Sequence, residues 1–346
     1  MNYKQRLVFS AKLLPLLSEN CNSVICPYGI ATVLSMVAEG ASQESLDEIL
    51  FVLGFEDMDE LREAVLSVQA VSCSAFSSQN ELVFEKGIKG LEILSNFRQI
   101  MDERYKADIE ENDSLGEAHF SLRNIANFKA EWLYEMERDT YCMRRFLNSN
   151  RKYTRPAFLQ NTSEYPYYFE NDKEEHVEAI AIPYKLDSRS IPYELVLINS
   201  SKDLTAEVLE NIFKNMSLEC CNVIFPEFSI KNEHNLIPVM NHLGAYTIFS
   251  KNFYGFDKIT TQALYASTFF QKAEIVVDEK GTVAVGETEM DCSQIGDYMD
   301  ESIPKEIVFD KPFYYFLRNT TTGEIIFMGK VNNLKNYQGK RKLSRW

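Results

Sequence analysis

Glycine and proline are scarce in this sequence. It has 14 glycines and 10 prolines in 346 residues, below the roughly 12% that these two residues together make up on average. This scarcity excludes collagen-like, linker-rich and low-complexity architectures. Hydrophobic residues make up 45% of the chain and charged residues 25%, so the chain can bury a large core and is not disordered. The length fits one large domain or two smaller ones.

Long apolar runs and positive charge are also lacking. No run approaches the ~18 apolar residues that identify a membrane-spanning helix, so we expect no membrane span. Lysine and arginine number 36 against 51 acidic residues, which gives a formal net charge of −15. A surface this acidic is a poor match for nucleic-acid phosphates, so we do not expect nucleic acid as a partner.

Residues 1–17 carry apolar side chains at helical spacing, which predicts an amphipathic first helix rather than a signal peptide. The seven cysteines are odd in number and scattered along the chain. This usage is typical of free thiols in a reducing compartment. We therefore expect a cytoplasmic protein, with secretion as the less favoured alternative.

The common catalytic motifs are missing. The sequence contains no G-x-S-x-G, no G-x-x-x-x-G-K-[ST], no G-x-G-x-x-G and no H-E-x-x-H, each of which has a defined chemical role. The four histidines are dispersed and the cysteines lack zinc-binding spacing, so we expect no metal and no cofactor. A serine–histidine–aspartate triad assembled by the fold stays open, but nothing local favours it. We expect a protein that is not an enzyme.

Helical patterns dominate the first third of the chain and strand patterns the rest. Apolar spacing and helix-capping residues predict helices over 27–40, 43–53, 57–70 and 88–107. Short apolar runs predict two hairpins, 177–183 with 193–198 and 307–317 with 325–331, and a strand over 273–278. Together these elements predict an α+β fold. Residues 335–346 form a basic C-terminal tail, and we expect its charged cluster Lys340, Arg341, Lys342 and Arg345 to be solvated.

Residues 281–304 combine two patterns that ordinary loops do not share. Along the first half, small or weakly polar residues alternate with valines and acidic residues, the small set being Thr282, Ala284, Gly286, Thr288, Met290 and Cys292. A period of two is typical of a strand with one buried and one wet face. The second half, 294–302, is acidic. This segment is therefore expected to be an exposed loop that is able to become a strand.

At this segment the chain resembles the serpin family. Residues 278–284 (D-E-K-G-T-V-A) are similar to the family's hinge pattern E-E/K-G-T-E-A. Further matches occur in the family's order: 22–27 resembles N-x-x-x-S-P with Cys26 for Ser, 124–132 resembles N-x-x-x-F-K-G-x-W, 182–185 resembles L-P-Y-K, 225–228 resembles L-P-R-F, and 310–313 and 326–331 resemble the closing D-H/K-P-F and F-M-G-R/K-V. Each motif is weak by itself, but their order and spacing are specific.

The resemblance implies a single domain over 1–334, with a reactive-centre loop at about 279–304. The expected fold is the α+β serpin fold, with mostly antiparallel sheets and an N-terminal helical portion. Two segments look short for the family, 54–82, where helix D belongs, and 105–124, where helix F belongs. Shortening or loss of these helices, with no visible signal peptide, resembles the intracellular poxvirus-type serpins.

The resemblance also implies a mechanism and assigns residues to it. A serpin is a suicide substrate: the protease cleaves the loop, and the loop then inserts into the main sheet and drags the trapped protease. The implied partner is thus a serine or cysteine protease, and the inhibitor is expected to be a monomer. The implied hinge residues are Glu279, Gly281, Thr282, Ala284, Gly286 and Thr288, and the implied scaffold residues around the insertion site are Asn124, Trp132, Gln271 and Lys272.

The scissile bond has several candidates. Counting from the hinge gives Ile295, whereas Ser302-Ile303-Pro304 resembles the S-I-P that follows the bond in many serpins and gives Glu301 or Asp300. Residues 297–300 have the D-x-x-D form that executioner caspases cut, so Asp300, or Asp297 as second choice, predicts a caspase or granzyme B target and a role in blocking apoptosis or inflammation. Two alternatives stay open: a protease that reads Tyr298, Met299 or Ile295, and a non-inhibitory binding or decoy protein.

Overall fold

The computed structural model describes residues 3–17, 20–71, 74–86, 91–112, 120–139, 143–172, 175–186, 189–253, 255–282 and 303–338. The helices fall mainly in the first third of the chain, as expected. They are α1 (Tyr3–Leu13), η1 (Leu14–Leu16), α2 (Pro27–Gly40), α3 (Gln43–Leu53), α4 (Met58–Val71), α5 (Ser95–Ile100), η2 (Met101–Tyr105, a π-helix), α6 (Ala206–Asn215), α7 (Ile237–Leu243) and η3 (Thr247–Phe249).

The first two predicted helices agree with α2 and α3 at both ends. At the start of α2, the Cys26 Sγ accepts a hydrogen bond from the Gly29 amide at 3.3 Å, so the thiol takes the N-cap role of a serine. At the end of α3, Gly54 adopts a left-handed conformation with φ of +83°, which glycine tolerates without strain. The prediction for 88–107 was too long, because the helix begins only at Ser95.

The strands fill the remaining two thirds. They are β1 (Ser23–Ile25), β2 (Phe76–Glu85), β3 (Asp108–Asn112), β4 (Phe120–Phe128), β5 (Ala130–Trp132), β6 (Glu137–Asp139), β7 (Phe146–Leu147), β8 (Tyr153–Thr154), β9 (Phe158–Asp172), β10 (Glu175–Leu186), β11 (Arg189–Ser200), β12 (Ser217–Pro226), β13 (Phe228–Asn235), β14 (Thr268–Val277), β15 (Gly281–Thr282), β16 (Lys305–Val308), β17 (Phe313–Asn319) and β18 (Ile325–Val331).

Both predicted hairpins are confirmed, as β10 with β11 and β17 with β18. The run 307–317 was wrongly predicted as one strand. It is divided into β16, which pairs with β12, and β17, which pairs with β11 and β18. Pro312 lies at the division, where its missing N–H would interrupt a strand ladder. The α+β class is confirmed.

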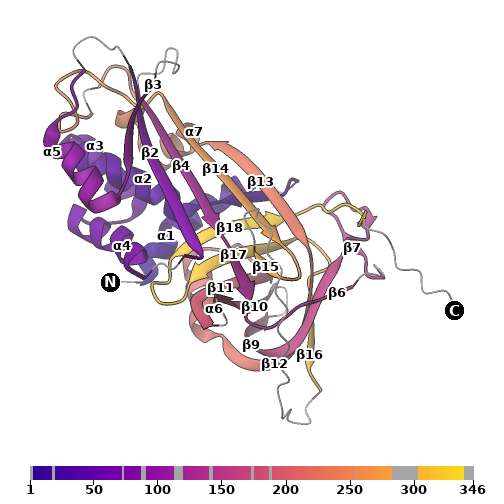
Figure 1. The fold of residues 1–346 in the computed structure, drawn as a ribbon. Coiled ribbons are helices and arrows are strands. Elements are labelled where there is room, and N and C mark those ends of the chain that lie inside the picture. Colours follow the sequence, from indigo (N-terminus) through magenta and orange to yellow (C-terminus); the bar gives the residue numbers. More distant parts are fainter. Residues whose placement is uncertain are drawn as a thin grey trace.

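The main sheet runs in the order β5-β15-β14-β4-β2-β3 toward one edge. Helices α1 to α5 gather behind β2 and β4 in the view of Figure 1, and the opposite face of β2, β4, β14 and β13 has no helix in front of it there. Between β3 and β4 only 113–119 intervene, and these residues lie outside the described part of the chain. The described residues thus hold no helix at the place expected for helix F. The segment 54–82, by contrast, contains α4, which confirms the helix predicted over 57–70 and shows that the place expected for helix D is not without a helix.

The start of the basic tail is anchored rather than free. The Asn336 Oδ1 accepts a hydrogen bond from the Arg155 amide at 2.8 Å, and the Tyr337 amide donates to the Arg155 carbonyl at 2.8 Å. The Tyr337 ring also lies 6.0 Å from the Arg138 guanidinium. The basic residues that were expected to be solvated, Lys340, Arg341, Lys342 and Arg345, come after this anchor and stay a prediction. Residues 339–346 lie outside the described part of the chain.

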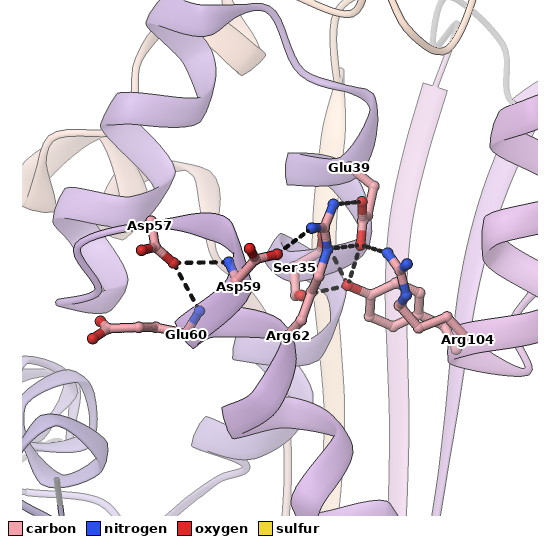
Figure 2. Close-up of polar contacts among 8 residues, drawn as sticks. Ser35, Glu39, Asp57, Asp59, Glu60, Arg62 and Arg104 are labelled. Carbon is pink, nitrogen blue, oxygen red and sulfur yellow. Dashed lines mark hydrogen bonds and ion pairs between the residues drawn. The ribbon is translucent and has the colours of Figure 1, made fainter. Parts of the chain in front are cut away.

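A buried carboxylate ties the helical portion together (Figure 2). The Glu39 side chain, on α2, is only 1% exposed and bonds to Arg62 of α4 and to Arg104 of η2. Two of the Arg62 nitrogens reach the carboxylate at 2.6 and 2.8 Å, and the Tyr105 hydroxyl donates to it at 3.1 Å. Burial acts to raise the pKa of Glu39, but the two guanidiniums outweigh it and lower that pKa below its usual value.

We predict that Glu39→Gln destabilises the protein by about 2–4 kcal/mol, because removing one partner leaves buried charge uncompensated. Chemical unfolding followed by circular dichroism measures this. The matched control is Asp59→Asn, which removes an 89% exposed carboxylate from the same Arg62 and should cost less than about 1 kcal/mol. Since the folded-state pKa of Glu39 is lowered, its contribution is present above the unfolded pKa of about 4.5 and is lost as the pH falls through the folded value. Equal losses in the two variants would contradict this account.

Candidate functional site

The candidate site is the seam where β4 and β14 meet. These strands pair in parallel from Ser121↔Thr268 to Ala126↔Ala273. Further along, β15 lies between β14 and β5, the short continuation of β4. It pairs antiparallel with both, through Thr282↔Val277 and Thr282↔Ala130. The described structure therefore shows a closed parallel seam with the first two residues of an antiparallel strand already seated at its open end.

A tight turn over 278–281 sets the register of this strand. The Asp278 carboxylate accepts hydrogen bonds from the Lys280 amide at 2.9 Å and the Gly281 amide at 3.2 Å. Trp132 holds the same turn from β5, because its indole N–H donates to the Asp278 carbonyl at 2.8 Å and its amide donates to the Lys280 carbonyl at 3.0 Å. Trp132 is buried and stacks on Tyr184. The fluorescence of the Trp132 indole should therefore respond directly to changes in the conformation of the hinge turn.

Close steric fit at Gly281 and a side-chain hydrogen bond of Thr282 add to the backbone pairing that holds β15 in place. A Cβ on Gly281 would lie 2.1 Å from the Ala130 carbonyl oxygen, so only glycine allows this close approach. Thr282 is 1% exposed, and its hydroxyl lies 2.6 Å from the Tyr184 hydroxyl. Burial raises the pKa of Tyr184 well above its ordinary value, which keeps this hydroxyl neutral. Thr282 is therefore enclosed between its two partner strands, with its hydroxyl against that of Tyr184.

Buried amides join the inner side of the closed seam. The Gln271 Nε2 donates to the Asn124 Oδ1 at 3.0 Å and to the Cys26 carbonyl at 2.9 Å, while its Oε1 accepts from the Cys26 amide at 2.8 Å. The Asn124 Nδ2 in turn donates to the Asn80 Oδ1 at 2.8 Å. This network fixes β14, β4 and β2 to the start of α2. The structure therefore brings Asn124 and Gln271 together beneath the seam, and their role as scaffold for insertion stays a prediction.

Lys272 does not join this network. Its side chain is 62% exposed on the outer face of β14, where it pairs with Glu233 of β13 at 3.5 Å. Other outer-face ion pairs are Lys231 with Glu274 and Arg123 with Glu81. Each of these three pairs joins strands on the same side of the β4–β14 seam. The scaffold assignment of Lys272 is thus corrected: it belongs to a solvated ion pair, because neighbouring strand residues face opposite sides.

Glu279 belongs to a charged cluster that no sequence pattern predicted. Its Oε2 lies 2.6 Å from an Arg138 nitrogen, and the Arg138 Nε donates to Glu227 at 2.6 Å. Burial, together with the charge of Glu279, raises the pKa of Glu227 to about 7, although Arg138 acts to lower it. One signal was present in the sequence: Glu227 stands where the resembled motif L-P-R-F has a basic residue. Arg138 carried no local signal.

The other predicted loop residues cannot be placed. Residues 283–302 lie outside the described part of the chain. They include the hinge candidates Ala284, Gly286 and Thr288 and the specificity candidates Asp297, Asp300 and Glu301. Where the chain is described, no three His, Cys, Asp or Glu residues are placed to hold a metal ion. No described helix is long and apolar enough to cross a bilayer.

Comparisons with known proteins converge on one family. The family model described as Serpin (serine protease inhibitor) matches residues 5–125 and 115–334. Plasminogen activator inhibitor 1 of Neovison vison is 25% identical over 91% of this chain and 88% of its own length. The superinfection exclusion protein of vaccinia virus (strain Copenhagen) is 28% identical, over 62% of this chain and 56% of its own length.

Solved structures agree with this fold. The crystal structure of native protease nexin-1 with heparin superimposes with a TM-score of 0.79 over 96% of this chain and 99% of that one, at 18% identity. The thermophilic serpin Tengpin in its native state gives a TM-score of 0.79 over 96% of this chain and 94% of its own, at 20% identity. The serpin fold expected from the sequence is confirmed.

We predict that Gly281→Ala forces β15 out from between β5 and β14, because the added methyl has no room beside the Ala130 carbonyl. Hydrogen–deuterium exchange of residues 278–282 should become at least tenfold faster, and the Trp132 emission should shift to longer wavelength. Lys280→Ala is the matched control, since it alters an exposed side chain of the same turn and should change neither readout. Unchanged exchange in Gly281→Ala would show that β15 does not depend on this contact.

Proposed function

We propose that this chain, which belongs to the serpin family, is a suicide-substrate inhibitor of a protease. Cleavage of the segment after Thr282 would free a strand whose first two residues already sit in the sheet. The rest of that strand would then enter the seam between β4 and β14 and carry the attached protease with it. The observation that carries this proposal is the seated antiparallel β15 at the open end of a parallel seam.

The energetics of the sheet favour insertion after cleavage. A strand that enters the seam replaces the parallel β4–β14 ladder with two antiparallel ladders, and antiparallel pairing is slightly more stable per residue. Exposed loop amides would also gain partners inside the sheet. Thr282 shows the size of side chain that the inner face accepts, and Ala284, Gly286 and Thr288 continue small residues at the same period of two. The uncleaved chain would be metastable by comparison.

The acidic loop supports an aspartate-directed target. Asp300 in the D-x-x-D segment 297–300 is the first choice for the specificity residue, with Asp297 and Glu301 as alternatives. Proteases of the caspase and granzyme B type recognise an aspartate through an arginine-lined pocket, and a bidentate contact of this kind is geometrically demanding. Such a target lies inside cells, so the proposal includes a cytoplasmic location and a role in limiting apoptosis or inflammation. The partial likeness to a vaccinia virus protein supports a viral, host-evading version of this role.

A non-inhibitory binding or decoy function is the second candidate. Two observations favour it. The described chain has no helix between β3 and β4 that could cover the outer face of β4 and β14. The segment between β15 and β16 is also long. Each extra residue adds about 3.3 Å of reach. A long segment would hold a trapped protease only loosely, so that the protease could escape distortion of its active site.

Incubation with executioner caspases and granzyme B tests the inhibitory function. The expected products are an SDS-stable complex and a cleaved inhibitor with a much higher thermal midpoint. Asp300→Ala should slow complex formation by at least about 30-fold, because truncating one partner of a desolvated charge pair costs 2 kcal/mol or more. Mass spectrometry of the cleaved segment identifies the bond.

Two controls separate insertion from cleavage. Thr282→Arg leaves the specificity residues intact but places a large charge in a buried position, so this variant should be cleaved as a substrate without forming a complex. Thr282→Ser should still form the complex. Cleavage of the wild-type chain by the whole panel, with neither a complex nor a rise in thermal midpoint, would overturn the inhibitor proposal and favour the binding function.

A further inference from the structure

Three side chains from separate elements meet at the hinge turn. Arg138 comes from β6, Glu227 lies between β12 and β13, and Glu279 belongs to the turn between β14 and β15. Arg138 bonds to Glu227 through its Nε at 2.6 Å and also through a terminal nitrogen. The same terminal nitrogen lies 2.6 Å from the Glu279 Oε2. One guanidinium thus serves two carboxyl groups, one of which moves with the hinge.

The hydrogen bonding of this cluster is incomplete. The Glu279 Oε2 is buried and accepts no hydrogen bond despite its closeness to Arg138. Two ionised carboxylates repel each other, and a single positive charge cannot neutralise both. A proton on Glu227 removes one negative charge, and the resulting O–H supplies the donor that Glu279 lacks. The geometry therefore favours the state in which the two carboxyl groups share one proton.

Three further titratable or charged groups lie near this pair. From the C-terminal segment, Tyr337 lies over Arg138. From the turn itself, Lys280 is exposed, and the Asp278 carboxylate accepts hydrogen bonds from the Lys280 and Gly281 amides. Burial acts to lower the pKa of Arg138, but Glu227, Glu279 and Tyr337 raise it above its usual value, so Arg138 stays charged at all relevant pH values. Burial raises the pKa of Glu227 to about 7, helped by Glu279. The titrating member of the cluster is Glu227.

We propose that Glu227, Arg138 and Glu279 form a proton-operated latch that holds the hinge turn in register. With the proton bound, Glu279 is tied to both partners and β15 stays seated between β5 and β14. With the proton released, two carboxylates compete for Arg138 and the turn loosens. The pKa of Glu227 is raised in the latched state, so the stabilisation is complete below about 4.5 and is lost as the pH rises through about 7.

The consequence for inhibition rests on the proposed function. Insertion starts from the seated residues Gly281 and Thr282, so a loosened turn delays it and gives the protease time to complete hydrolysis. Raising the pH from 6 to 8 should therefore increase the number of inhibitor molecules consumed per protease trapped. The latch itself needs no protease, and its test is independent of that outcome.

Tryptophan emission tests the latch directly. The chain has two tryptophans, and Trp346→Phe leaves Trp132, whose indole bonds to the hinge turn at the Asp278 carbonyl. Across pH 5.5–8.5 the emission should change with a midpoint near 7, since Glu227 passes from about 90% to about 10% protonated between pH 6 and 8. Hydrogen–deuterium exchange of 278–282 should speed up over the same range.

Charge variants made in the Trp346→Phe protein show whether Glu227 causes the change in emission. Glu227→Gln imitates the protonated acid and should keep the low-pH emission up to pH 8. Glu279→Gln removes the neighbouring negative charge and should move the midpoint below 7. Glu131→Gln is the matched control, because Glu131 is an exposed carboxylate directly opposite Gly281, and it should leave the midpoint unchanged.

Two results would overturn the latch: an emission that is flat between pH 6 and 8 in the wild-type hinge, or a pH response that survives in Glu227→Gln. If the latch titrates as expected but no protease is trapped at any pH, the inhibitor proposal fails and the latch stands. If proteases are trapped equally well at pH 6 and 8 in wild type and Glu227→Gln while the emission titrates, the latch exists without the stated consequence for inhibition.

Discussion

The parallel pairing of β4 with β14 is the contact on which the rest of this structure depends. For the proposed inhibitory function, this pairing must be firm enough to keep the sheet closed and weak enough to give way to an incoming strand. The backbone ladder over Ser121–Ala126 and Thr268–Ala273 supplies the first property. The second follows from the seated β15, because a strand that is already paired at one end extends residue by residue and avoids a separate nucleation step.

The side chains on the two faces of the seam differ in a way that fits both properties, a closed seam that can still open. On the inner side, hydrogen bonds from the Gln271 side chain to Asn124 and Cys26 keep the closed seam aligned beside the buried register pair Leu122 and Phe269. On the outer side, the pairs Arg123–Glu81, Lys231–Glu274 and Lys272–Glu233 each join strands on the same side of the seam, so opening the seam breaks none of these three. The two halves of the sheet can separate as units while each keeps its own contacts, including the helices behind β2 and β4.

Local patterns were enough to predict much of the fold and part of the site. The helices over 27–40 and 43–53 and both hairpins follow from apolar period and turn residues, which act within a few positions. Pro312 was a local signal for the split between β16 and β17, whereas the different partners of these two strands, β12 for one and β11 with β18 for the other, depend on the fold. The Glu39 and Glu227 clusters could not be predicted from local patterns. Their arginine partners are 23 and 89 positions away in the sequence, and only the fold brings them into contact. Thr282 and Gly281 were found through a family motif, whereas their fit beside Tyr184 and Ala130 required coordinates.

A disulfide across the outer face of the seam would test the central claim most directly. Ile125 and Lys272 are directly paired on β4 and β14, and adjacent strands lie about 4.8 Å apart, within the Cα separation that a disulfide spans. In Ile125→Cys/Lys272→Cys, with the single variants as controls, the thermal midpoint is measured before and after loop cleavage. The account predicts a large rise on cleavage in the reduced protein and none in the oxidised protein. A rise of equal size in both would show that the cleaved loop does not enter this seam.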